Sequence, residues 1–336
     1  MIKIISPLLY SVYQRNHLNR ARVAIRGKAA RKFEKVEAAF RPCGAGYDAK
    51  PKWQVIAGKS GNLTFGGHLD VPAGGWYTLK IRTMRRGKTV ETGLVGKFGV
   101  GEVFITAGQS NFANYAEPRQ KTKTRLVSSF NGSGWQISDD PQPICTGEMG
   151  SVLPALGDLL SDTLNLPVGF LCLAVGGTMV SHWDPDLKIP EDHRPLMHEA
   201  LYVRYFKTYG PDFLKTYGAR ALLWHQGESD RESRYEDYYR SLKKLISRFK
   251  KDIGRDLPWI VATVGNSQMD RKFGAGARKG QAQVIEEGLA LAGPDTDTIN
   301  SRLRLPGSSH FNRKGLAIHA RLWFAMIYYH LQTGKI

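Results

Sequence analysis

The chain has 336 residues, 42% of them hydrophobic and 23% charged, which is typical of globular proteins and argues against a disordered or fibrous chain. Three widely spaced cysteines argue against a disulfide framework or a zinc ribbon. Of the formal net charge of +18, +14 lies in residues 1–100, which hold 19 Lys and Arg against 5 Asp and Glu. Such a basic region suits contact with an acidic glycan, a membrane surface or nucleic acid, unless it is only a solvated face.

No apolar run approaches the roughly 18 residues that a membrane span requires, so we expect no span. The first residues lack the small-residue cleavage site of a secretory signal. Scarce cysteine favours the cytoplasm. An exported protein whose signal has been removed is the alternative, and the compartment stays unassigned.

The first hundred residues predict short strands separated by turns rich in glycine and proline. The strand patterns lie at residues 21–26, 53–56, 63–65 and 76–82. This punctuation is typical of a β-sandwich. We therefore predict a small, basic β-sandwich domain over residues 1–100 and a second domain over residues 101–336. Trp53, Trp76 and Tyr77 are expected to be core residues and not platforms for sugars.

From residue 101 onward, strand and helix patterns alternate. Strands are expected at residues 103–107, 168–175, 221–224 and 259–264. Helices are expected at residues 152–164, 235–249, 281–291 and 316–329. Such alternation builds a parallel sheet with helices on both faces. The predicted fold class is α/β, with a three-layer α/β/α domain after the β-sandwich.

Three of these strands end in polar or glycine-rich clusters. The clusters are Gly-Gln-Ser-Asn at 108–111, Gly-Gly-Thr at 176–178 and His-Gln-Gly-Glu at 225–228, and Ser-Ser-His-Phe-Asn at 308–312 precedes the last helix. Because ligands bind at the carboxyl ends of strands in an open parallel sheet, we expect these segments to converge. A serine, a histidine, a carboxylate and N–H donors in one place are the components of acyl transfer.

Ser110 is the candidate nucleophile, and His310 is the candidate base that takes its proton. Glu228 is the candidate carboxylate that accepts the second imidazole N–H and stabilises the imidazolium. Each residue also has a plainer interpretation. Ser110 could be the N-cap of the next helix, Glu228 an acid favoured at a helix N-terminus, and His310 a structural histidine.

Donors for a developing oxyanion are expected around the serine. They are the backbone N–H groups of Ser110 and Gly177 and the side-chain amide of Gln226 or Asn111. Gly177 is otherwise a turn glycine.

Histidine and aspartate residues also gather between residues 182 and 198, among them Asp192 and His193. Their spacing is not that of metal ligands, so we predict no metal site. This segment is either a loop that faces the substrate or a solvated one.

Four ordered blocks resemble those of SGNH-type carbohydrate esterases, in particular the branch of sialate O-acetylesterases and acetylxylan-esterase-like proteins. The blocks are residues 104–111, 174–178, 224–229 and 310–312. The resemblance covers residues 101–336 and implies a flavodoxin-like α/β/α hydrolase that removes acetyl groups from sugar hydroxyls without a cofactor. It also implies that Ser110 is the nucleophile, that His310 is the base, and that Gly177 and Gln226 belong to the oxyanion site.

One position departs from the family pattern. Many SGNH hydrolases have an aspartate three residues before the catalytic histidine, where this chain has Gly307. The resemblance to acetylxylan esterases with a His-Gln-Gly-Glu block points to Glu228 instead. Asp295, Asp297 or a backbone carbonyl are the alternatives.

The predicted function is that of a serine O-acetylesterase acting on acetylated saccharides of the sialic acid or xylan type through an acetyl-enzyme. One alternative is a lipase or thioesterase on the same scaffold. The other is a carbohydrate- or polyanion-binding protein that has lost catalysis. The expected partners are an acetylated oligo- or polysaccharide and an acidic glycan at the basic N-terminal region, with no specific nucleic acid.

Overall fold

The computed structural model describes residues 1–43, 52–58, 63–188, 196–265 and 274–336. The described part of the first hundred residues consists mostly of strands, and along β3 and β6 side chains tend to alternate between buried and exposed. The strands are β1 (Lys3–Ser6), β2 (Ser11–Gln14), β3 (Arg20–Lys28), β4 (Lys35–Pro42), β5 (Gln54–Ala57), β6 (Thr64–Pro72), β7 (Gly74–Arg85) and β8 (Lys88–Gly108). Strands β1, β3 and β6 form one antiparallel sheet, and β4, β5 and β7 join β8 in another. Buried apolar residues of both sheets share one core.

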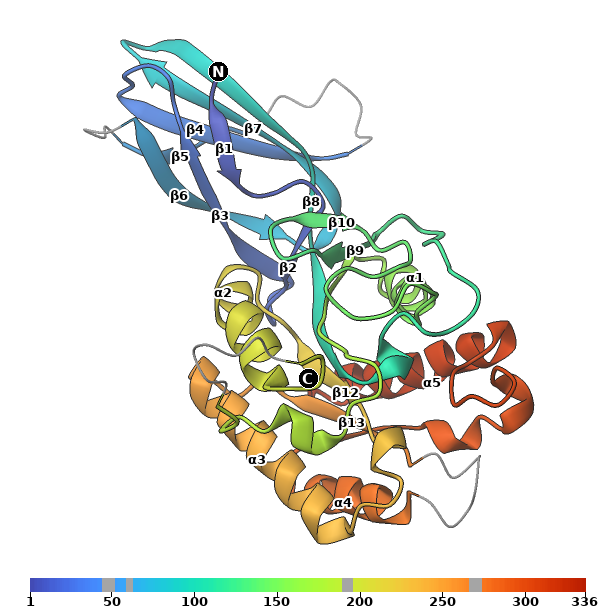
Figure 1. Ribbon diagram of the computed structural model, residues 1–336. Helices are drawn as coiled ribbons and strands as arrows, with labels where there is room; N and C mark the ends of the chain where they lie inside the picture. The colour runs from blue at the N-terminus through green and yellow to red at the C-terminus, as the bar shows by residue number, and fades with distance from the viewer. Residues whose placement is uncertain (44–51, 59–62, 189–195, 266–273) are drawn as a thin grey trace.

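Strand β8 runs without interruption from the N-terminal region into the centre of the molecule (Figure 1). Its first half pairs with β7, and its second half pairs with β11 (Val168–Cys172) and β12 (Ala221–His225). Gly101, at the predicted boundary, permits a close approach of two strands, because a Cβ there would lie 2.0 Å from the carbonyl oxygen of Pro167. The predicted boundary after residue 100 falls inside this strand, and the division into two domains stays a prediction.

The rest of the chain is built on a parallel sheet. Its other strands are β9 (Val127–Phe130), β10 (Trp135–Ile137), β13 (Trp259–Thr263) and β14 (Leu291–Asp295). The strand order is β10-β9-β11-β8-β12-β13-β14, with parallel pairing from β9 to β14 and an antiparallel pairing of β10 with β9. The chain therefore has the predicted mixed α/β fold, in which parallel strands deliver their carboxyl ends to one edge.

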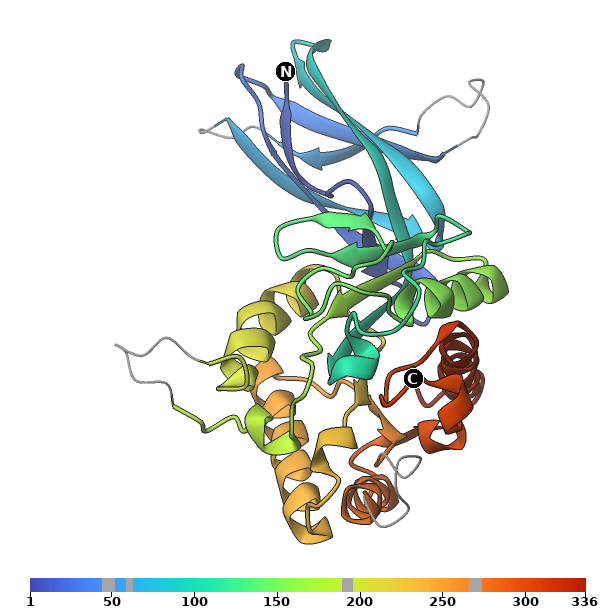
Figure 2. The same ribbon diagram turned by 45° about the vertical axis from the view of Figure 1, so that its right-hand side comes forward.

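Helices cover both faces of this sheet (Figures 1 and 2). One face packs against α1 (Leu153–Leu164) and α5 (Arg313–Gln332), and the other against α2 (Thr208–Thr216), α3 (Tyr235–Ile253) and α4 (Ala275–Glu286). Successive residues of a strand point to opposite faces, which explains why β8, β9, β11, β12 and β13 each contribute to two separate apolar clusters. Within the described parts of the chain, no helix has the length and apolar content needed to cross a bilayer.

The sequence patterns locate most helices correctly, and α1, α3 and α5 are confirmed. The helix predicted over residues 281–291 is wrong at both ends, because α4 begins at Ala275 and Leu291 belongs to β14. Gly288, with a φ of +70°, takes the left-handed conformation that follows many helix ends. Strands β9 and β10 were not predicted, since four and three residues are too few to show an alternation.

Trp76 and Tyr77 lie in the core, as predicted, with 8% and 5% of their surface exposed. The prediction for Trp53 is wrong. Its ring is half-buried outside the core, with the Arg82 guanidinium carbon 4.1 Å from the ring centroid. Trp53 precedes β5, which pairs with β4 alone among the described strands, and Val55 of that strand is 62% exposed. An apolar pattern in such an edge strand does not imply burial.

Candidate active site

The carboxyl ends of β8, β11 and β12 meet at one edge of the central sheet. Beyond the paired residues, the Gln109 N–H donates to the His225 carbonyl at 2.8 Å, and the Val175 N–H donates to the Gly108 carbonyl at 3.0 Å. Gly108 has a φ of +124°, and a Cβ there would lie 2.0 Å from the His225 carbonyl oxygen. Only glycine fits this turn, which leads directly into Ser110.

Ser110 begins a short 3-10 helix, η1 (Ser110–Phe112). Gln109 holds the N-cap position, so Ser110 is not the cap of its plainer interpretation. The serine is 4% exposed. Among the described residues, the structure shows no hydrogen bond to its hydroxyl and none from its backbone N–H. Both groups are therefore available to a ligand.

The segment that carries His310 is tied directly to the serine turn. Asn111 Nδ2 donates to the carbonyl oxygen of Ser309 at 3.2 Å, across 198 positions of sequence. The Tyr115 ring packs on the His310 imidazole, with centroids 5.2 Å apart and planes inclined by 31°. Within the described residues, the imidazole makes no hydrogen bond, and Ser110 is not bonded to it. Bonds between a catalytic base and its partner are often long until substrate binds.

The environment of His310 keeps its imidazole neutral. Burial lowers the pKa of His310 below the ordinary 6.5, the Glu228 carboxylate opposes this shift, and the Arg304 guanidinium adds to it. A lowered pKa leaves the ring able to accept a proton at neutral pH. His310 thus has the protonation state that a general base requires.

Glu228 begins η4 (Glu228–Asp230) and is 5% exposed. Its Oε1 accepts a hydrogen bond from Asn111 Nδ2 at 2.7 Å and lies 3.0 Å from His225 Nε2. Burial acts to raise the pKa of Glu228, but the charge and hydrogen bond of His225 and the bond from Asn111 outweigh it and lower this pKa to about 2. The buried Oε2 has no hydrogen-bond partner among the described residues. Glu228 is thus an ionised carboxylate that supports Asn111.

The other candidate acids are engaged elsewhere. Asp295 and Asp297 both pair with Arg278, at 2.7 and 3.1 Å. Gly307 has a φ of +64°, is exposed, and a Cβ there would meet no atom within 4 Å. A side chain at this position would point into open space.

The candidate oxyanion donors differ in their availability. Gly177 is exposed, has a φ of +70°, and its N–H has no acceptor among the described residues. Gln226 is fully buried, and its Nε2 donates to the Thr178 carbonyl at 2.9 Å and to the Asp230 carboxylate. The Asn111 amide is occupied by the two bonds described above. Backbone N–H groups are therefore the free donors at this edge.

Two histidines of the predicted loop lie beside the Gly176–Gly177 turn. The rings of His182 and His198 stack with centroids 5.3 Å apart, and His198 Nε2 lies 3.0 Å from the Gly176 carbonyl oxygen. Asp192 and His193 lie outside the described residues. In the described part of the chain, no group of three or more His, Cys, Asp or Glu is placed to hold a metal ion.

Polar groups at the carboxyl edge of a parallel α/β sheet lie where such folds bind their ligands. Comparison with known proteins shows that this chain is a carboxylic ester hydrolase. It belongs to the family of carbohydrate esterases described as sialic acid-specific acetylesterases, whose model matches residues 100–317. This match begins within β8 and ends in α5, so it includes every candidate residue described above.

One solved structure shares the fold, and two others are less similar. A carbohydrate acetylesterase from Xanthomonas citri has a TM-score of 0.58 at 16% identity, over 99% of this chain and 76% of that one. A protein from Arabidopsis thaliana has a TM-score of 0.48 at 21% identity, over 68% and 97% of the two chains. A lipase/acylhydrolase from Enterococcus faecalis has a TM-score of 0.42 at 11% identity, over 68% and 96%. No curated protein sequence matches this chain.

Proposed function

We propose that this acetyl-removing carbohydrate esterase uses Ser110 as nucleophile and His310 as base, and that its substrates are acetylated saccharides of the sialic acid or xylan type. The hydrogen bond from Asn111 to Ser309 supports the assignment most strongly. It joins the residue after the serine to the residue before the histidine, and so supports a single site that contains both Ser110 and His310.

In the proposed reaction, Ser110 Oγ attacks the acetyl carbonyl carbon while His310 accepts the hydroxyl proton. The bond from the acetyl carbon to the sugar oxygen then breaks, and the imidazolium returns the proton to that oxygen. Water attacks the carbonyl carbon of the resulting acetyl-enzyme while His310 takes a proton from the water. The bond from the acetyl carbon to Ser110 Oγ then breaks, the imidazolium returns the proton to Oγ, and acetic acid leaves the site. The lowered pKa of His310 favours this route, because each half-reaction starts from the neutral ring.

The negative charge on the carbonyl oxygen needs donors that are free beforehand. The backbone N–H groups of Ser110 and Gly177 fill this role in the proposal, and each such donor is worth about 3 kcal/mol in the transition state. Gln226 was predicted as a further donor. With its amide engaged by Thr178 and Asp230, it acts here as a positioning residue that holds the turn after β11.

The Glu228 carboxylate supports the proposed reaction in two ways. Its negative charge raises the pKa of His310 and so stabilises the imidazolium, without a hydrogen bond to the ring. Its Oε1 also holds Asn111, which in turn holds Ser309. Asn111 is accordingly a positioning residue in this proposal.

The test is Ser110→Ala, with Ser133→Ala as the matched control, since Ser133 lies exposed in the turn between β9 and β10. We expect hydrolysis of p-nitrophenyl acetate to fall by about 10⁴-fold or more for Ser110→Ala and to remain unchanged for the control. Full turnover by Ser110→Ala would refute the nucleophile. A strong preference for octanoyl over acetyl esters would favour the lipase alternative, and polyanion binding without turnover by the wild type would favour the decayed enzyme.

A further inference from the structure

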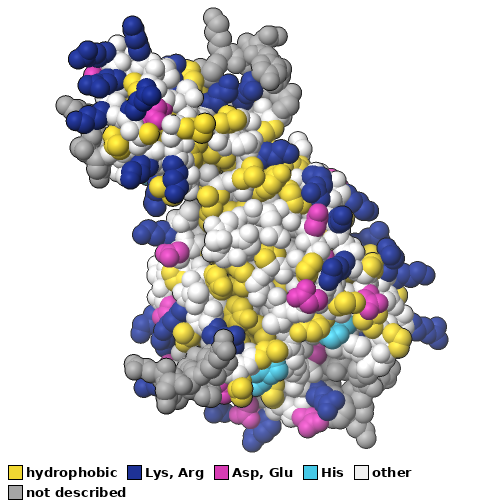
Figure 3. Space-filling view, turned by 45° about the horizontal axis from the view of Figure 1, so that its top comes forward, with side chains coloured by type: hydrophobic (Ala, Val, Ile, Leu, Met, Phe, Trp, Pro, Cys, Tyr) yellow, Lys and Arg dark blue, Asp and Glu magenta, His cyan; other side chains and the backbone are white. Residues whose placement is uncertain are grey.

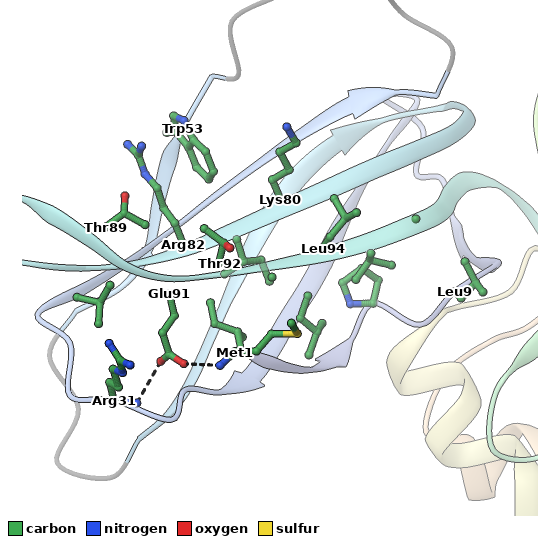
Figure 4. Close-up of a pocket in the computed structure, with 18 of the residues that line it drawn as sticks. Met1, Leu9, Arg31, Trp53, Lys80, Arg82, Thr89, Glu91, Thr92 and Leu94 are labelled. Carbon is green, nitrogen blue, oxygen red and sulfur yellow. Dashed lines mark hydrogen bonds and ion pairs between the residues drawn. The ribbon is translucent and has the colours of Figure 1, made fainter. Parts of the chain in front are cut away.

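A cavity of about 1090 Å³ lies in the N-terminal region, away from the candidate active site. Residues of β1, β7 and the first half of β8 line it, together with Trp53 (Figure 4). From Gly96, at its near end, strand β8 continues for 12 residues to Gly108, which at about 3.3 Å per residue is up to roughly 40 Å. The cavity and the serine turn are thus distinct sites on one continuous strand.

An aromatic ring is held in place at the border of this cavity. Arg82 Nε donates to Glu37 Oε2 at 2.7 Å, and the same guanidinium lies 4.1 Å from the Trp53 ring centroid. One face of the indole is thereby fixed on a cation that is itself fixed by a carboxylate. Leu9 and Leu94 add exposed apolar surface to the lining, at 50% and 63% exposure. Exposed apolar side chains that gather in one place are typical of a binding surface. Here they lie beside an aromatic ring whose orientation is fixed by Arg82.

Cations complete the lining. Lys80 of β7 lies opposite Leu94 of β8, and Arg31 borders the other side (Figure 4). Among the described residues, the structure shows no ion pair for Lys80 or Arg31. The acidic Glu91 is engaged by the backbone N–H groups of residues 30 and 31. Lys and Arg side chains also crowd the surface of this region (Figure 3), which carries +14 of the net charge.

We propose that this cavity binds an acidic saccharide chain, one that bears carboxylate or sulfate groups. The C–H face of a sugar ring carries slight positive charge and packs on the negative face of the indole, while Lys80 and Arg31 meet the acidic groups. The Trp53 ring and the cations Lys80 and Arg31, which have no ion pair within the described parts of the chain, suit widely spaced charges better than the dense phosphates and successive bases of a nucleic acid.

The consequence for catalysis rests on the proposed function and extends it. A polymer held at Trp53 stays near the enzyme while acetyl groups further along the same chain reach Ser110. The effective concentration of those acetyl groups rises without any change in the chemical step. The cavity should therefore lower KM for acetylated acidic polymers and leave kcat unaltered.

The direct test is calorimetric titration of the full chain with polygalacturonic acid, which carries no acetyl groups, and with neutral dextran. We expect Trp53→Ala and Lys80→Gln each to weaken binding of the acidic polymer about tenfold or more, and Trp53→Phe to retain most of it. The matched controls are Tyr329→Ala and Lys335→Gln. Tyr329 is an exposed aromatic residue of α5, and Lys335, which follows that helix, has its Nζ 5.4 Å from the centroid of the Tyr329 ring. These should bind as the wild type does.

Unchanged affinity in Trp53→Ala would overturn the proposal, as would equal affinity of the wild type for dextran. So would equally tight binding of single-stranded DNA with the same dependence on Trp53, which would indicate a general polyanion surface. In turnover assays, Trp53→Ala should raise KM for an acetylated uronate polymer and leave hydrolysis of p-nitrophenyl acetate unchanged. Because the titration needs no turnover, its failure and a failure of the Ser110 mechanism are separate results.

Discussion

Replacing Glu228 by glutamine preserves the size of the side chain and removes a buried negative charge. A pKa of about 2 in place of 4.5 corresponds to about 3 kcal/mol of stabilisation of the ionised carboxylate. Because the folded protein lowers this pKa, the contribution is complete above about pH 4.5 and is lost as the pH falls toward 2. Glu228→Gln should therefore lower the free energy of unfolding by about 3 kcal/mol at pH 7. The difference from the wild type should shrink below pH 4.5.

Urea unfolding followed by tryptophan fluorescence measures this loss, and hydrolysis of p-nitrophenyl acetate measures kcat beside it. If Glu228 acts on His310 by charge alone, kcat should fall by about tenfold and the acidic midpoint of the pH profile should move lower, since an opposing charge is gone. A fall in kcat near 10⁴-fold with unchanged stability would refute this reasoning, because that is the cost of removing an acid bonded directly to the catalytic imidazole.

Glu102→Gln is the matched control. Glu102 is fully buried and pairs with Arg15 at 2.6 Å and Arg220 at 2.7 Å, at the opposite end of the central sheet from the site. This variant should also be destabilised, with kcat unchanged. Stability of Glu228→Gln equal to that of the wild type at pH 7 would equally contradict the argument.

Two further predictions concern His310. Burial lowers its pKa, and a base with a lowered pKa stays neutral in more acidic solution, so the acidic midpoint of kcat/KM should lie below 6.5; a midpoint above 6.5 would contradict the assignment. Tyr115→Ala exposes the imidazole and should lower kcat about tenfold while moving that midpoint up toward 6.5. Tyr115→Phe keeps the ring and should behave as the wild type. If Tyr115→Ala loses kcat without a shift in the midpoint, Tyr115 does not act through the environment of His310.

The sequence by itself determined the parallel sheet and the edge of it at which the candidate site lies. Apolar runs of strand length alternating with helical patterns predict the architecture, because only that arrangement buries both faces of such strands. Polar clusters at strand ends then converge by topology alone. For this reason the sequence alone places Ser110, Gly177 and the segment before His310 at one edge of the sheet.

Only the tertiary structure decided which hydrogen-bond donors at that edge have no partner within the described parts of the protein. In the sequence Gln226 is as good a donor as a backbone N–H, but the fold surrounds its amide with acceptors. Tyr115 carries no signal at all, since its contact with His310 joins distant parts of the chain, and Trp53 was mistaken for a core residue. The periodicity of a sequence indicates which face of a helix or strand is apolar. The groups that accept a hydrogen bond from a buried amide, or that stack on a ring, belong to distant parts of the chain, so no local sequence pattern predicts them.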